Sequence, residues 1–283
     1  MIRIGPAGWS YKDWEGIVYP QKPGRKFDPL SYLSGFFDTI EINSTFYRPP
    51  SPSSAADWVR RVEHNVQFKF TAKLYRAFTH ESSGASPQDE TDYRKGLDPI
   101  FQTGRLGAIL IQFPWSFKNT DTGRERLDRL LKQFSEYPLV VEVRHASWNR
   151  PDVLDWFEEA GVGFCNIDQP LFRHSIKPSS VATSMVGYIR LHGRNYRSWF
   201  TENRKPSDRY DYLYPLEELE PWVDRVRLVS REVKETFVVT NNHYLGKGIV
   251  NALDIKALLV GGKVRGPAIL SERYPHLKQL MTA

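Results

Sequence analysis

Four acidic, basic and imidazole side chains end or follow short apolar segments of the chain and could carry acid/base chemistry. These candidate catalytic residues are Glu41, Lys73, Glu142 and His192. A carboxylate near a lysine or arginine stays ionised and can act as a base, and a histidine exchanges protons near neutrality. We therefore expect Glu142 or Glu41 to be the base and His192 the acid. Lys73 would bind an anion, form a Schiff base if it is desolvated, or pair with one of the glutamates.

Carboxylate and imidazole side chains on separate segments could instead hold a divalent metal ion. The candidate ligands are Glu41, Glu142, Asp168 and His192. They come singly along the chain, and no compact spacing such as His-Glu-x-x-His supports them. Metal-free chemistry is the simpler hypothesis, and the cofactor is left open. The phosphate-binding pattern Gly-x-Gly-x-x-Gly is missing after the first apolar segment, so we expect no dinucleotide.

Aromatic, amide and basic residues form a second group that could bind a small ring-bearing anion. Flat rings stack on sugars or bases, while amide and guanidinium groups hydrogen-bond to their edges. The candidate substrate-binding residues are Trp9, Tyr11, Asn43, Tyr47, Gln112, Arg144, His145, Trp148, Arg190, Arg194, Asn195, Trp199 and Asn242. Packing against a helix is the simpler explanation of any single tryptophan, but not of all of them together.

Elements that bring these residues together can be read from the hydrophobic pattern. Strands are predicted at 2–9, 39–44, 67–74, 106–114, 138–145, 163–168, 186–193 and 236–243. Helices are predicted at 29–37, 53–64, 91–103, 123–136, 151–160, 215–235 and 248–260. Strands that alternate with helices predict a parallel sheet, and eight of them favour one (β/α)8 TIM barrel over residues 1–283, with long loops after strands six and seven. A doubly wound open sheet is the alternative.

Polar and apolar residues alternate along most of these strands. In 39–44, for example, Ile40 and Ile42 oppose Glu41 and Asn43. The helices outside a parallel barrel need apolar contacts, so the polar sets should face the barrel axis. The charged residues expected there are Glu41, Lys69, Lys73, Glu142, Arg144, Asp168 and Arg190. The deeper ones, Lys69 and Arg190, would form an ion network, and those near the carboxyl ends of the strands would line a pocket.

The loop 194–214 combines five basic residues with six aromatic ones. We expect it to leave the barrel through a sharp turn at Gly193 and to fold over the pocket as a lid, with Trp199 and Phe200 excluding water. The alternative is a static loop. Its composition also supports a second functional hypothesis, the binding or processing of nucleic acid, which would weaken steeply with salt.

The composition limits the possible classes of protein. The 283 residues are 40% hydrophobic and 25% charged, with a net charge of +6, which is typical of a globular chain and excludes a disordered or fibrous one. One cysteine, Cys165, cannot form an internal disulfide, and no apolar segment is long enough for a membrane span. We therefore expect a soluble, cytoplasmic protein.

Several long strings of residues resemble a known family. They are 8–16 with Tyr19-Pro20, 41–47, 70–73 with Thr79-His80, 142–148, 190–195, and 241–243 with Asn251-Ala252. In these strings the chain resembles the YecE-like family, domain of unknown function 72, over nearly its whole length; Val18 departs from the aromatic residue usual there. The resemblance implies a TIM barrel and supplies no reaction.

The residues together favour an enzyme that acts on a small anionic, ring-bearing metabolite such as a sugar acid, a sugar phosphate or a nucleotide. Hydrolase, lyase and isomerase chemistry all stay open, as does the oligomeric state. A protein that binds such a metabolite without turning it over would use the same pocket.

Overall fold

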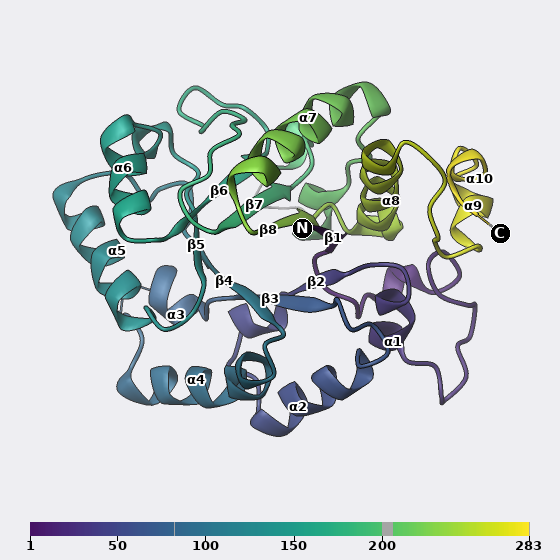
Figure 1. The fold of residues 1–283 in the computed structure, drawn as a ribbon, viewed down its shortest axis with the longest axis horizontal. Helices are drawn as coiled ribbons and strands as arrows, with labels where there is room; N and C mark the ends of the chain where they lie inside the picture. The colour runs from purple at the N-terminus through teal and green to yellow at the C-terminus, as the bar shows by residue number, and fades with distance from the viewer. Residues whose placement is uncertain (82, 200–205, 283) are drawn as a thin grey trace.

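Eight parallel strands alternate with helices in the computed structural model, which describes residues 1–81, 83–199 and 206–282 (Figure 1). The strands are β1 Ile2–Pro6, β2 Thr39–Ile42, β3 Lys69–Lys73, β4 Leu106–Gln112, β5 Leu139–Glu142, β6 Gly163–Asp168, β7 Val186–Leu191 and β8 Glu235–Thr240. Their order is β1-β8-β7-β6-β5-β4-β3-β2, so each strand lies beside its neighbours in sequence. This order confirms the predicted (β/α)8 TIM barrel.

The helices lie outside the ring of strands (Figure 1). They are α1 Pro29–Ser34, α2 Pro52–Arg61, α3 Arg76–Thr79, α4 Pro87–Gln102, α5 Asp121–Gln133, α6 Pro151–Glu159, α7 Leu216–Glu232, α8 Lys247–Val260, α9 Leu270–Arg273 and α10 Leu277–Leu280. The sequence analysis missed α3, α9 and α10 because four residues are too few to show a helical period. Helix α4 begins four residues before the predicted start, at a capping box formed by Ser86 and Asp89. No helix in the described ranges is long and apolar enough to cross a bilayer.

Most predicted strands extend too far at their carboxyl ends. Strand β5 ends at Glu142 and β7 at Leu191, where the prediction continued to His145 and Gly193. The extra residues leave the sheet and form the loops at the carboxyl end of the barrel. These loops carry most of the polar candidates, so the error lies where the chain changes from strand to site.

The barrel closes between β1 and β2 through one bridge rather than a full ladder. Ala7 pairs with Glu41, and the Gly8 amide donates to the Glu41 carbonyl at 2.8 Å. A Cβ atom on Gly5 would lie 1.8 Å from the Thr39 carbonyl oxygen. Glycine is therefore required at Gly5 for the first two strands to approach each other.

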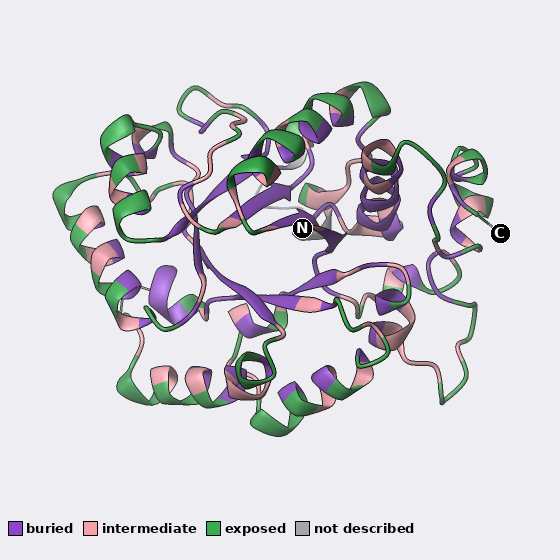
Figure 2. Cartoon of the chain, viewed as in Figure 1, coloured by how far each residue is buried: buried purple, intermediate pink, exposed green. Residues whose placement is uncertain are grey.

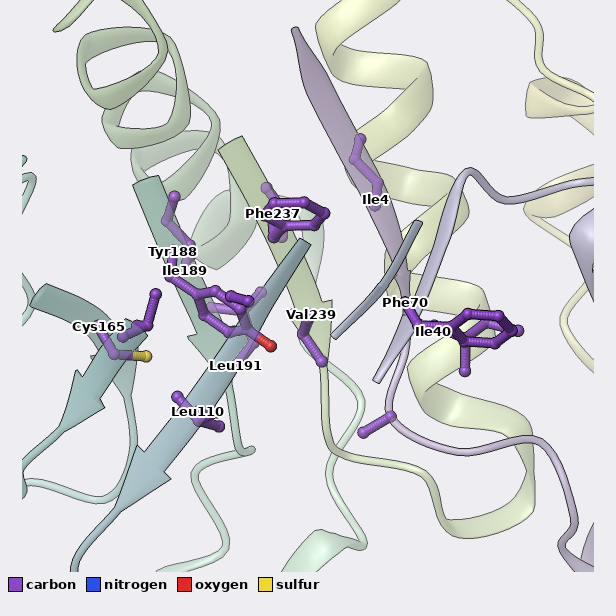
Figure 3. Packing of buried hydrophobic residues seen from close by; sticks show 14 of the residues in the cluster. Ile4, Ile40, Phe70, Leu110, Cys165, Tyr188, Ile189, Leu191, Phe237 and Val239 are labelled. Atoms are coloured by element: carbon purple, nitrogen blue, oxygen red, sulfur yellow. The ribbon is translucent and has the colours of Figure 1, made fainter. Parts of the chain in front are cut away.

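The alternation of strand residues separates the two sides of the barrel wall as predicted. The strands are almost entirely buried, while the helices show exposed outer faces (Figure 2). Tyr188 of β7 and Phe237 of β8 come from neighbouring strands with ring centroids 6.2 Å apart (Figure 3). At the amino end of the barrel Glu235 binds Lys69 at 2.7 Å and Arg3 at 3.0 Å. The predicted ion pairing of Lys69 is thereby confirmed.

Candidate active site at the carboxyl end of the barrel

Arg190 of β7 joins the two candidate glutamates inside the barrel. Its Nη2 lies 2.7 Å from Glu41 Oε1, its Nε 3.0 Å from Glu41 Oε2, and its Nη1 3.0 Å from Glu142 Oε2. Tyr188 donates a further hydrogen bond to Glu41 at 2.9 Å and is itself 2.8 Å from the Thr71 hydroxyl. Arg190 and both glutamates are at most 1% exposed. The predicted ion network around Arg190 is confirmed, and it occupies both carboxylates.

Glu142 also accepts hydrogen bonds from two residues that follow the strands, Arg144 and His192. Arg144 donates to its Oε1 through Nε at 3.0 Å and Nη2 at 2.8 Å, and His192 Nε2 lies 3.1 Å from the same oxygen. Burial opposes ionisation of Glu142, but the charges of Arg190 and Arg144 and the hydrogen bond from His192 prevail and hold its pKa well below the usual range. A carboxylate with this many donors is a poor proton acceptor, so the geometry does not favour Glu142 as the base.

His192 is a neutral, fully buried ring. Burial lowers its pKa to about 3, although the Glu142 carboxylate acts in the opposite direction. Its Nδ1 lies 3.1 Å from the Asn241 amide nitrogen, so the proton belongs on Nε2, where it is donated to Glu142. Both ring nitrogens are thus engaged, and this geometry does not favour His192 as the acid.

A cavity of about 380 Å³ opens beside this network at the carboxyl ends of the strands. That end of a TIM barrel holds the active site in nearly every characterised barrel enzyme. The lining residues are Gly8, Trp9, Ser10, Tyr11, Asn43, Ser44, Tyr47, Lys73, Arg190, Tyr210, Asn241 and His243. Six of them, Trp9, Tyr11, Asn43, Tyr47, Lys73 and Arg190, are candidates from the sequence analysis.

Lys73 ends β3 with its amine on the cavity wall. It is 9% exposed, and no described carboxylate lies within salt-bridge distance of its Nζ, so the structure does not show the predicted pairing with Glu41 or Glu142. Its Nζ makes a cation–π contact with the ring of Phe46, whose centroid is 4.0 Å away. Lys73 is therefore a buried amine without a direct counter-ion among the residues that the structure describes.

Burial lowers the pKa of Lys73 from 10.5 to about 7, with further lowering by Arg190. The Phe46 ring favours the ammonium form, but a cation–π contact contributes only about 0.5–2 kcal/mol. The difference between these two pKa values corresponds to about 5 kcal/mol. Burial prevails, and a large fraction of Lys73 is neutral amine at neutral pH.

Two polar atoms on the cavity wall lack a hydrogen-bond partner within the described protein. Asn43 Oδ1 and His243 Nδ1 are both buried. The His243 ring stacks on Tyr11 at 4.3 Å and lies 4.9 Å from Tyr210. Burial lowers the pKa of His243 to about 4, so the ring is neutral. Both residues line the cavity, and each has one polar atom whose hydrogen-bonding capacity the described protein leaves unused.

The four candidate metal ligands do not meet at one point. Asp168 was expected on the barrel axis, but it shares the outer face of β6 with Phe164, where the buried indole of Trp222 in α7 donates to it at 2.8 Å. Arg194 binds it at 2.9 Å from the loop side. Within residues 1–81, 83–199 and 206–282, no group of three or more histidine, cysteine, aspartate or glutamate side chains could hold a metal ion. The inward placement of Asp168 is wrong because α7 covers that face.

Several other candidates lie outside the cavity. Trp148 is fully buried and stacks on Phe117, to whose carbonyl its indole donates at 2.9 Å. His145 accepts a hydrogen bond from the Ser147 amide, away from Glu142. Gln112 ends β4 and pairs in register with Glu142.

The loop after β7 passes over the site where the structure describes it. Gly193 has φ +90°, as the predicted sharp turn requires, and a Cβ there would lie 2.9 Å from Tyr212 Cβ. Asn195 donates to the Asp208 carbonyl at 2.8 Å, which ties the two ends of the loop together. Trp199 is 7% exposed, and its ring is 6.2 Å from the ring of His192.

The same loop bears on the other hypotheses. Asn242 donates to the Tyr212 carbonyl at 2.8 Å and so supports the loop rather than the cavity. Arg194 is paired with Asp168 and Glu218. Phe200 and residues 201–205 lie outside the described residues. Opening and closing of the loop, and nucleic-acid binding by it, both stay predictions.

Sequence reasoning missed half of the cavity lining. The missed residues are Gly8, Ser10, Ser44, Tyr210, Asn241 and His243. Asn241 and His243 belong to the string 241–243, from which only Asn242 was chosen. The alternation along β8 could have identified Asn241. Phe237 and Val239 lie on the inner face of this strand, and Asn241 continues the same series just past its end.

Comparison with known proteins gives a consistent set of matches. The family model described as "Protein of unknown function DUF72" matches residues 3–272. The UPF0759 protein YunF of Bacillus subtilis is 26% identical over 277 residues, which cover 92% of this chain and 95% of that protein. A DUF72 family protein from Thermotoga maritima is 34% identical in its crystal structure, with a TM-score of 0.81 over 92% of this chain and 99% of that one. Another from Enterococcus faecalis, 24% identical, has a TM-score of 0.80 over 92% and 96% of the two chains.

Proposed function

The chain belongs to the DUF72 family, whose description assigns no reaction, and from its site we propose that it is an enzyme in which Lys73 exchanges a proton with a small, hydroxyl-rich, ring-bearing metabolite. The observation that carries this proposal is the buried amine of Lys73 on the cavity wall, with a pKa of about 7 and without a carboxylate partner among residues 1–81, 83–199 and 206–282. A group that titrates near the working pH is the most effective general acid or base. Lys73 thus takes the role that the sequence analysis gave to Glu142 and His192.

The charges around the cavity limit the substrate. Arg190 and Arg144 are balanced by Glu41 and Glu142, so among the described residues around the cavity only the protonated fraction of Lys73 adds positive charge for a ligand. A substrate with one negative charge at most fits this balance. Among the anticipated ligands, a sugar acid fits better than a sugar phosphate or a nucleotide, which carry more charge.

The shape and chemistry of the wall agree with such a substrate. Trp9, Tyr11 and Tyr210 offer flat faces to a sugar ring, and Asn43 and His243 offer free polar atoms to its hydroxyls. A volume of about 380 Å³ lies within the range of ordinary small-molecule sites. We place the reaction in the cytoplasm, since the single cysteine, Cys165, is buried and needs no oxidising compartment.

The experiment is a comparison of metabolites before and after incubation with the protein. A small-molecule extract is treated with wild type, with Lys73→Met, or with Lys132→Met as a matched exposed control, and each mixture is profiled by mass spectrometry. We expect at least one hydroxyl-rich compound to be consumed by wild type and by the control. Lys73→Met should consume it at least about 100-fold more slowly, because general acid–base catalysis typically raises a reaction rate by about 10²–10⁴-fold.

Each other result has a defined meaning. Equal consumption by wild type and Lys73→Met would contradict the role of Lys73. Retention of a compound without its conversion would instead support a metabolite-binding protein.

A further inference from the structure

We propose that Lys73 acts as a nucleophile, forming a covalent imine with the carbonyl carbon of a hydroxylated aldehyde or ketone, such as the open-chain form of a sugar or a keto sugar acid. This inference rests on the proposed function and deepens it by naming the reacting group of the substrate. Its basis is the placement of the amine: at the end of a strand, on the wall of a cavity and without a salt-bridge partner in the part of the chain that the structure describes.

The backbone at Lys73 is fixed on two sides. Its carbonyl oxygen accepts hydrogen bonds from Thr45 Oγ1 at 2.7 Å and from the Tyr93 hydroxyl at 2.9 Å. Thr45 follows β2 and Tyr93 lies in α4, and both are fully buried. The strand end is thereby held from two elements, and the Phe46 ring, 4.0 Å from Nζ, packs against the amine itself. A nucleophile needs such positioning to meet a bound carbonyl carbon at a favourable angle.

The surroundings of the amine favour its neutral form. The charged and titratable groups that act on it are Arg190, Arg144, Glu41, Glu142 and His80. The glutamates bind the arginines directly, and His80 is itself neutral because burial lowers its pKa to about 4. The Phe46 ring covers one side of the amine. A desolvated amine of this kind is the usual activated lysine nucleophile.

The proposed step balances without any further reactant. The nitrogen lone pair of Lys73 attacks the carbonyl carbon, a C–N bond forms, and the carbonyl π electrons move to oxygen, which takes up a proton. The resulting hydroxyl leaves as water with a second proton, and the nitrogen loses its two protons overall. Ketone or aldehyde plus amine thus gives imine plus water, with no change of oxidation state. The protonated imine then draws electrons from a neighbouring C–H or C–C bond, as isomerase or lyase chemistry requires.

The test is reductive trapping of the imine. Wild type is incubated at pH 7 with D-glyceraldehyde and sodium cyanoborohydride, and the modified lysines are located by peptide mass spectrometry. Exposed lysine amines are protonated at this pH, whereas a large fraction of Lys73 is neutral, so Lys73 should be labelled at least about tenfold faster than Lys132, whose side chain is 77% exposed. Lys73→Arg should lose the fast label, and Lys132→Arg should keep it.

Trapping and metabolite consumption report separately. If consumption depends on Lys73 but its peptide is labelled no faster than surface lysines, the imine is wrong and the proposed proton-transfer function stands. If no compound is consumed in a Lys73-dependent way, the proposed function fails, and a fast label at Lys73 would then show a reactive amine without turnover, which also overturns the inference. Thermal unfolding of each variant, followed by tryptophan fluorescence, confirms that a lost label does not come from a lost fold.

Discussion

A Lys73→Met variant is expected to be more stable than wild type at and below pH 7, by up to about 5 kcal/mol in free energy of unfolding. The pKa of Lys73 is about 7 in the folded protein and 10.5 as its ordinary value. Between these pH values the unfolded chain binds the proton that the folded chain releases, so wild type is penalised. The gain from methionine should therefore be near its minimum at pH 10.5, grow by about 1.4 kcal/mol for each pH unit down to 7, and level off below.

The measurement is urea unfolding of both proteins between pH 6 and 10. Lys132→Met removes an exposed lysine on α5 and serves as the control, with a difference from wild type that stays nearly constant across this range. A stability gain for Lys73→Met that does not change with pH would show that Lys73 keeps an ordinary pKa in the fold.

The second large effect is expected at Arg190, in the opposite direction. Arg190→Met leaves Glu41 and Glu142 buried without the guanidinium that joins them, and loss of one partner from a buried ion network costs about 3–5 kcal/mol. Adding Glu41→Gln removes one of the stranded charges, so the double variant should recover part of that loss. Denaturant unfolding at pH 7 measures both.

An exposed pair gives the contrast for this prediction. Arg60 binds Asp57 on the surface of α2 with 72% of its side chain exposed, so Arg60→Ala should cost no more than about 1 kcal/mol. If Arg190→Met lowered the free energy of unfolding no more than Arg60→Ala, the buried ion network would not stabilise the fold around the site.

The fold could be predicted from sequence because each strand shows its own alternation of residues within a short segment, and such segments can be counted along the chain. Apolar residues such as Ile40 and Ile42 face the surrounding helices, and the alternation alone predicts that they point outward. Asp168 shows the limit of that reasoning. Asn166 and Asp168 share one face of β6, so the rule that polar residues face the axis predicts an inward Asp168, whereas the indole of Trp222, 54 residues later, binds it on the outside.

The site was predictable in position but not in the roles of its residues. Glu41, Lys73 and Glu142 were expected near the carboxyl end of the barrel and Arg190 deeper inside it, and Arg190 binds both glutamates. Their roles depend on which charge binds which, and sequence does not give those distances. Arg190 lies between the two glutamates, so neither of them pairs with Lys73.

At a pH near 7, about half of the protein molecules carry Lys73 as a neutral amine. Direct titration of its Nζ is the sharpest test of this protonation state. Protein labelled with ¹³C and ¹⁵N at lysine is followed by NMR from pH 5 to 11, and the Lys73 signal is identified as the one missing in Lys73→Met. We expect a midpoint at a pH of about 7, more than two pH units below those of ordinary lysine amines. A midpoint above 10 would contradict it.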